Sequence, residues 1–148
     1  GRGAFLNDRR LRVSKRERLI DGLIGTGFPF RMFDHADPYV GMMRDFMQKT
    51  AGIRRPGAAA LDLANVAAGR LDGFWEIGLH PWDMAAGVLM VLEAGGLVGD
   101  LEGNTGYLES GRIVAGSPRI FGQMISVIEP HLTPELRTEP PKPASAPA

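Results

Sequence analysis

Two short stretches of the sequence carry side chains that could bind or transform a ligand. In the first, Glu76, His80 and Asp83 fall within eight residues, just before and at the start of an apolar segment that runs to Gly95-Gly96. A carboxylate beside apolar residues is costly unless a positive group satisfies it, and a divalent cation would do so. Two roles for Asp83 therefore stay open: a metal ligand at the rim of a cleft, or a structural cap at a helix N-terminus.

The second stretch, Arg54-Arg55-Pro56-Gly57-Ala58-Ala59, places a glycine and small residues at the start of an Ala-rich segment. Small residues let an anion approach the backbone N–H groups of a helix start, and arginine donates to phosphate in a forked geometry. The pattern is weak, because an ordinary glycine turn before an alanine helix packed on a neighbour uses the same residues. Both interpretations stay open.

Three other groups of residues have simpler structural explanations. Asp34-His35-Ala36-Asp37 has a spacing that could suit a metal, but Asp37-Pro38 is typical of a helix cap with proline at the first helical position. His131 is expected to complement the dipole at the end of a helix. Five methionines are expected to fill the core, namely Met42, Met43, Met47, Met84 and Met90.

The elements that must position these residues follow from the hydrophobic pattern. Residues 4–13 predict a β-hairpin with its turn at Asn7-Asp8. Strands alternate with helices of ten or more residues, which predicts a parallel or mixed sheet with helices packed on it. The segment 82–94 is apolar on nearly every face, so we expect it to be buried between two layers. The predicted strands are 19–27, 71–77, 97–98 and 113–115, and residues 53–55 are expected to form a short strand or a loop. The predicted helices are 37–52, 58–68, 82–94 and 118–131.

Length and composition narrow the class of protein. The 148 residues are enough for one domain, which we place at residues 1–132, and residues 133–148 contain five prolines and predict a disordered tail. Without cysteine, disulfide scaffolds, thiolate zinc sites and cysteine nucleophiles are excluded. No apolar run approaches the roughly 20 residues that span a bilayer, so we expect no membrane partner and a cytoplasmic location.

The basic residues are concentrated at the N-terminus. The chain has no net charge, but residues 1–20 hold seven Lys or Arg against Asp8 and Glu17. Such an arm can bind nucleic acid, although a solvated hairpin is the commoner explanation and no aromatic residues alternate with the charges.

Longer runs of the sequence resemble the inositol monophosphatase family. They are GRGAFLN, LRVS, GTGFPF, RRPGAAALDLANVAAGRLDGFWEIGLHPWD, WDMAAGVLMVLEAGG and IVAGSPRI. The sequence is therefore identified as a member of this family, closest to its bacterial inositol-1-monophosphatase branch. The resemblance implies an α/β fold, namely the C-terminal half of the layered sandwich of the inositol monophosphatase and fructose-1,6-bisphosphatase type, with a mixed sheet flanked by helices.

The resemblance also implies roles for the residues already singled out. Asp83 would bind Mg²⁺, and Glu76 would contact hydroxyl groups of inositol monophosphate or a similar sugar-like phosphate. No catalytic residue beyond the metal ligand is implied. The substrate-binding residues would be Arg54, Gly57, Ala58, Ala59, Glu76 and Asp83.

One departure from the family pattern limits this prediction. The family's Asp-Pro-Ile/Leu-Asp-Gly-Thr segment, which supplies two metal-binding carboxylates, is absent, and so is an upstream glutamate ligand. Asp37-Pro38-Tyr39-Val40-Gly41 begins similarly but lacks the second Asp and the Thr. We therefore expect a chain that is one half of a Mg²⁺-dependent phosphatase, inactive alone and homodimeric when complete. The alternative is a non-catalytic fragment or interaction protein that binds RNA or the transcription machinery.

Overall fold

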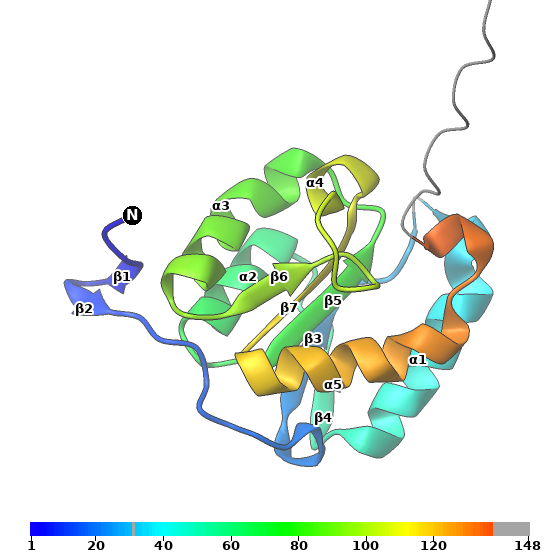
Figure 1. The fold of residues 1–148 in the computed structure, drawn as a ribbon, viewed down its shortest axis with the longest axis horizontal. Helices are drawn as coiled ribbons and strands as arrows, with labels where there is room; N and C mark the ends of the chain where they lie inside the picture. The colour runs from blue at the N-terminus through cyan, green and yellow to red at the C-terminus, as the bar shows by residue number, and fades with distance from the viewer. Residues whose placement is uncertain (31, 138–148) are drawn as a thin grey trace, which may run out of the picture.

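A five-stranded mixed sheet with helices on both faces forms the body of the protein (Figure 1). The computed structural model describes residues 1–30 and 32–137. The sheet has the order β4-β3-β5-β7-β6, with β4, β3 and β5 parallel and β7 antiparallel to both of its neighbours. The predicted α/β architecture is thereby confirmed. The strands are β3 Leu23–Thr26, β4 Gly52–Arg54, β5 Gly73–Ile77, β6 Leu97–Gly99 and β7 Arg112–Gly116.

The helices divide between the two faces of the sheet. α2 and α3 cover one face and α1 and α5 the other (Figure 1). Short 3-10 turns occur at Leu19–Asp21, Phe33–His35, Glu129–His131 and Pro134–Leu136. The helices are α1 Ala36–Lys49, α2 Ala59–Ala67, α3 Pro81–Glu93, α4 Tyr107–Ser110 and α5 Pro118–Ile128.

Strand β5 connects the two hydrophobic cores, because successive side chains of a strand point to opposite faces. Phe74 is fully buried in the core beneath α2 and α3, and Trp75 is fully buried in the core beneath α1 and α5. On the second side, Tyr39 of α1 stacks on the Trp75 ring and Phe46 lies tilted against it, with ring centroids 5.7 and 4.3 Å away. By alternation, Glu76 belongs to the same face as Phe74.

The predicted hairpin is confirmed, and it lies apart from the five-stranded sheet (Figure 1). Its strands are β1 Phe5–Leu6 and β2 Arg9–Arg10, joined by Asn7 and Asp8, which both have positive φ angles. This is the pairing of left-handed residues that a two-residue hairpin turn requires. One backbone bond, from Val13 N to Ala94 O at 3.0 Å, ties the chain after the hairpin to the end of α3.

Helix α3 differs from its prediction. Its inner side, at Met84 and Val91, is fully buried, but Trp82 and Leu89 on its outer side are 76% and 58% exposed. The predicted burial of residues 82–94 between two layers is therefore wrong for this chain. The sequence pattern was apolar all round, yet the described residues supply a layer on only one side of the helix.

Two smaller predictions also need correction, and a third gains a contact. Helix α1 begins at Ala36, so Asp37 and Pro38 lie inside its first turn and not at the cap and first positions. Met47 is 67% exposed and does not fill the core. His131 ends the 3-10 turn Glu129–His131, and its Nε2 lies 2.6 Å from Asp45 Oδ2. This hydrogen bond lowers the pKa of Asp45.

The described chain continues beyond residue 132, where we placed the end of the domain. Leu136 is buried in the core beneath α1 and α5. Arg137 pairs with Glu102 at 3.5 Å and with Glu129 at 3.1 Å. Residues 133–137 thus close one end of that core, and the rest of the predicted tail, 138–148, lies outside the described residues.

Candidate functional site

A cavity of about 240 Å³ opens where β5 ends and α2 and α3 begin. It brings together five of the six predicted site residues, because β3, β4 and β5 are parallel and their carboxyl ends meet at one edge of the sheet. Arg54 does not line it. The lining residues are Phe28, Phe30, Arg55, Gly57, Ala58, Ala59, Glu76, Ile77, Gly78, Leu79 and Asp83.

Asp83 combines a structural role with a place in the cavity. It is the third residue of α3, and its Oδ2 accepts a hydrogen bond from the His80 backbone N–H at 2.9 Å. The Asp83 N–H in turn donates to the His80 carbonyl at 2.9 Å. The carboxylate is therefore held at the positive end of the helix, where negative charge is favoured.

The Glu76 side chain lies against Gly27, the residue that follows β3. A Cβ on Gly27 would overlap the Glu76 carboxylate, so glycine at position 27 is what allows that carboxylate to sit there. Gly78, which follows β5, has a φ of +90° and allows the chain to turn toward α3. The two carboxylates of the cavity thus come from a strand end and a helix start joined by one tight turn.

Arg55 is the arginine of the cavity. Its guanidinium carbon lies 5.1 Å from the ring centroid of Phe28 and 5.3 Å from that of Phe30, within range of a cation–π interaction. Arg54 instead belongs to β4, and its guanidinium donates to the Ile53 carbonyl at 3.0 Å. The sequence contains no signal that chooses between the two, because the choice depends on which residue ends the strand.

Sequence reasoning missed Asp62, a carboxylate of α2 that is 1% exposed. Its Oδ1 is buried with no hydrogen-bond partner among the described residues. Burial raises the pKa of Asp62 to about 6, and the positive charge of Arg55 opposes that rise. The sequence did contain a signal for it, because Asp62 stands between Leu61 and Leu63 in a largely apolar helix.

The raised pKa of Asp62 predicts a pH-dependent stability. A carboxyl group whose pKa is higher in the folded than in the unfolded chain stabilises the fold while it is protonated. This stabilisation is fully present below the unfolded-state pKa near 3.8, and it is lost as the pH rises through the folded-state pKa of about 6. Asp62→Asn, which resembles the neutral acid, should therefore be more stable than the unaltered chain above pH 6, by about 3 kcal/mol. Urea unfolding of both proteins from pH 4 to 8 measures the difference. A constant difference across that range would contradict the prediction.

The donor groups of the cavity suit a hard divalent cation in part. Carboxylate oxygens such as those of Asp83 and Glu76 are the ligands that Mg²⁺ prefers. Within residues 1–30 and 32–137, however, no group of three His, Cys, Asp or Glu side chains could hold a metal ion, and this includes the cluster from Asp34 to Asp37. The described residues can therefore contribute to a magnesium site but do not complete one.

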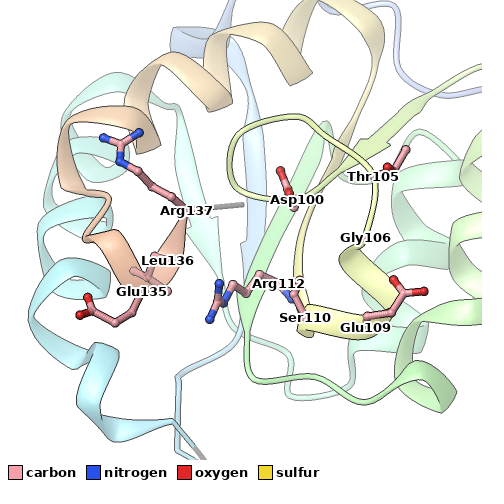
Figure 2. Close-up of a pocket in the computed structure, with 9 residues that line it drawn as sticks. All are labelled: Asp100, Thr105, Gly106, Glu109, Ser110, Arg112, Glu135, Leu136 and Arg137. Carbon is pink, nitrogen blue, oxygen red and sulfur yellow. The ribbon is translucent and has the colours of Figure 1, made fainter. Parts of the chain in front are cut away.

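A larger cavity, of about 610 Å³, lies between the segment from Asp100 to Arg112 and the 3-10 turn Pro134–Leu136 (Figure 2). Two arginines and three carboxylates line it, and Arg137 is already paired with Glu102 and Glu129. Asp100 also has partners within the chain, since its Oδ1 accepts hydrogen bonds from the backbone N–H groups of Glu102 and Asn104, both at 2.9 Å. This mixed set does not converge on one ligand, so the smaller cavity is the better candidate site.

Comparisons with known proteins agree with this placement of the fold. The sequence model of the inositol monophosphatase family matches residues 1–133. The chain is 58% identical over 139 residues to the Nus factor SuhB of Pseudomonas aeruginosa, covering 93% of this chain and 51% of that protein. It is 47% identical over 133 residues to the inositol-1-monophosphatase of Mesorhizobium japonicum, covering 90% of this chain and 50% of that protein.

Solved structures give the same result. The crystal structure of the extragenic suppressor protein suhB from Bartonella henselae matches with a TM-score of 0.82 at 50% identity, covering 86% of this chain and 48% of that one. Inositol monophosphatase from Anabaena matches with a TM-score of 0.81 at 38% identity, covering 88% and 52%. The chain thus spans about half the length of the relatives it matches. It belongs to the inositol monophosphatase family.

Proposed function

We propose that this chain contributes the polyol-binding side and one metal ligand to a Mg²⁺-dependent phosphatase that hydrolyses inositol-1-phosphate or a similar sugar-like phosphate in the cytoplasm. The observation that carries the proposal is the convergence of Asp83, Glu76 and the start of α2 on one cavity. The match to the family and to a relative named inositol-1-monophosphatase supports it.

Each lining group has a defined task in this proposal. Asp83 would hold Mg²⁺, which when bound polarises the phosphate and lowers the pKa of a water molecule. Glu76 accepts hydrogen bonds from ring hydroxyls and so orients the polyol. The small residues Gly57, Ala58 and Ala59 leave room for the substrate at the helix start, where N–H groups favour an anion.

Arg55 supplies positive charge beside this cavity, and we propose it in place of Arg54. The aromatic rings of Phe28 and Phe30 limit the rotation of its guanidinium and thereby fix its direction. Arginine fixed in this way donates to a phosphate or a hydroxyl with little further loss of side-chain entropy.

The chain by itself is predicted to release no phosphate from inositol-1-phosphate above the background rate. The reason is that Asp83 and Glu76 alone cannot enclose a magnesium ion, which usually needs several oxygen ligands. Phosphate release by the purified 148-residue chain with Mg²⁺ measures this. Turnover that Asp83→Asn abolishes would contradict the prediction, whereas turnover that survives Asp83→Asn would indicate a contaminating phosphatase.

A second candidate function is binding to RNA or the transcription machinery. It is favoured by the exposed Arg9, Arg10 and Arg12 of the hairpin region and by the Nus factor name that the Pseudomonas relative carries. Binding carried by phosphate contacts weakens steeply with salt. Salt-dependent RNA binding that is lost when these three arginines are replaced by Gln would support this function, and binding that they do not affect would argue against it.

We further propose that the complete protein is a homodimer. An apolar groove of about 270 Å³ beside the start of α1 supports this, because Phe30 and Phe33 are 69% and 78% exposed there. Contiguous exposed apolar side chains of this kind favour association.

No helix of the described residues is long and apolar enough to cross a membrane.

A further inference from the structure

Two buried hydroxyl groups lie close to the candidate site, on the face of the sheet that α1 covers (Figure 1). Tyr39 of α1 is 4% exposed, Thr26 at the end of β3 is fully buried, and their side-chain oxygens are 3.0 Å apart. The Thr26 hydroxyl also lies 2.9 Å from the carbonyl oxygen of Trp75 in β5. One helix and two strands are therefore joined by a short chain of hydrogen bonds.

The direction of these hydrogen bonds follows from the carbonyl at one end of the chain. A carbonyl oxygen can only accept, so Thr26 donates its single hydroxyl proton to Trp75. The Thr26 oxygen then accepts the proton of Tyr39. Burial is the main cause that raises the pKa of Tyr39 to about 12, and the negative charge of Glu76 adds to the rise. The phenol therefore stays protonated and able to donate at neutral pH.

These hydrogen bonds lie where β3 and β5 separate. Thr26 and Trp75 are the last paired residues of the two parallel strands. The residues that follow them, Gly27 and Glu76, are in contact, since the Glu76 carboxylate fills the space that a Cβ on Gly27 would need. Because interiors are close-packed, such a contact leaves little tolerance, and a small shift of either strand end displaces the carboxylate.

The Tyr39 ring also contacts the aromatic wall of the cavity. It meets Phe28 edge to face, with ring centroids 6.2 Å apart. Phe28 lines the cavity and lies against the Arg55 guanidinium. Stacking on Trp75 fixes the plane of the Tyr39 ring and with it the place of the hydroxyl. The ring therefore holds the hydroxyl in position, and a substitution that removes only the hydroxyl leaves these ring contacts unchanged.

We infer that Tyr39 and Thr26 are positioning residues of the candidate site, which hold the Glu76 carboxylate in place by fixing the ends of β3 and β5. They act through other residues, since neither is among those that line the cavity. Their effect on a substrate rests on the proposed function, in which Glu76 orients the polyol. The fixing of the strand ends does not rest on it, so the two effects can be tested apart.

Hydrogen exchange in the 148-residue chain tests the strand ends without any reaction. Tyr39→Phe keeps the ring and removes only the hydroxyl. Thr26→Val leaves the Tyr39 hydroxyl buried without its partner, so it should have the larger effect. Thr50→Val is the matched control, because it removes a buried hydroxyl that donates to the Phe46 carbonyl at 2.6 Å, at the opposite end of α1 from the cavity.

The amide hydrogens of Ile77 and Gly78, measured by NMR, should exchange at least about tenfold faster in Tyr39→Phe than in Thr50→Val. Thr26→Ser keeps a hydroxyl and should restore exchange to within about threefold of the unaltered chain. Equal exchange rates in Tyr39→Phe and Thr50→Val would overturn the proposal, since the hydroxyl pair would then contribute only to overall stability.

Steady-state kinetics test the effect on a substrate, in a complex of this chain with a separate polypeptide equivalent to the part of its relatives that the chain does not match. In Tyr39→Phe, KM for inositol-1-phosphate should rise about fivefold or more, with kcat within about twofold. KM for p-nitrophenyl phosphate, which has no ring hydroxyl for Glu76 to bind, should stay within about twofold. Equal rises for both substrates would overturn the positioning of Glu76. If the unaltered complex releases phosphate from neither substrate, the proposed function fails, while the exchange rates still decide on the strand ends.

Discussion

Asp83→Asn, introduced into this chain and combined with a separate polypeptide equivalent to the part of its relatives that the chain does not match, should lower kcat for inositol-1-phosphate by about a hundredfold or more. This is equivalent to about 3 kcal/mol in the transition state. The amide has no negative charge and binds Mg²⁺ poorly. It can still accept the hydrogen bond from the His80 N–H, so the helix start should survive. Steady-state phosphate release at saturating Mg²⁺ measures the effect.

Glu93→Gln is the matched control for this experiment. It removes one negative charge from the opposite end of the same helix, outside the cavity. Its kcat should stay within about threefold of the unaltered complex, which corresponds to less than 1 kcal/mol. If Asp83→Asn retains activity to the same degree as Glu93→Gln, Asp83 is only a structural residue.

Gly111→Ala should lower the free energy of unfolding by about 3 kcal/mol, with much of the loss caused by overlap with backbone. Gly111 has a φ of +74°, and a Cβ there would overlap the Leu79 carbonyl oxygen. Its own carbonyl accepts hydrogen bonds from the Gly78 and Leu79 N–H groups, both at 3.0 Å. The substitution therefore also displaces the turn that carries the chain from Glu76 to Asp83.

Gly106→Ala separates backbone strain from overlap. Gly106 has a φ of +93°, but a Cβ there would meet nothing within 4 Å, so it should cost only about 1 kcal/mol. Urea unfolding of both variants at neutral pH gives the comparison. Equal losses for the two substitutions would mean that the contact with Leu79 contributes nothing.

The candidate site was predictable where local pattern determined it. Glu76 and Asp83 are separated by one tight turn, and Gly57 opens a helix, so a strand-then-helix prediction already placed them at the same edge of a sheet. The side on which Arg54 and Arg55 fall was not predictable, because it depends on where β4 ends. A one-residue shift in a strand reverses which side chain faces a cavity.

The sequence predicted that α3 packs on the sheet but not how much of its surface is buried. The all-apolar pattern of α3 predicted burial on two sides, yet the described residues cover the helix on only one side. Asp62 shows the opposite case, where a charged residue is buried because its helix position faces the core. Periodicity identifies the inner stripe of a helix and does not reveal what the rest of the fold supplies.

The Asp83 side chain accepts a hydrogen bond from the His80 N–H and also carries the negative charge proposed to bind Mg²⁺. A mutant library at position 83 can test these two roles separately. A selection for folded protein alone should accept Asn there, because its side-chain oxygen still accepts that bond. It should disfavour Ala, which loses about 1 kcal/mol of capping energy. A selection for growth that depends on the phosphatase should reject both. Sequencing the library after each selection would therefore separate the folding contribution of this side chain from its chemical one.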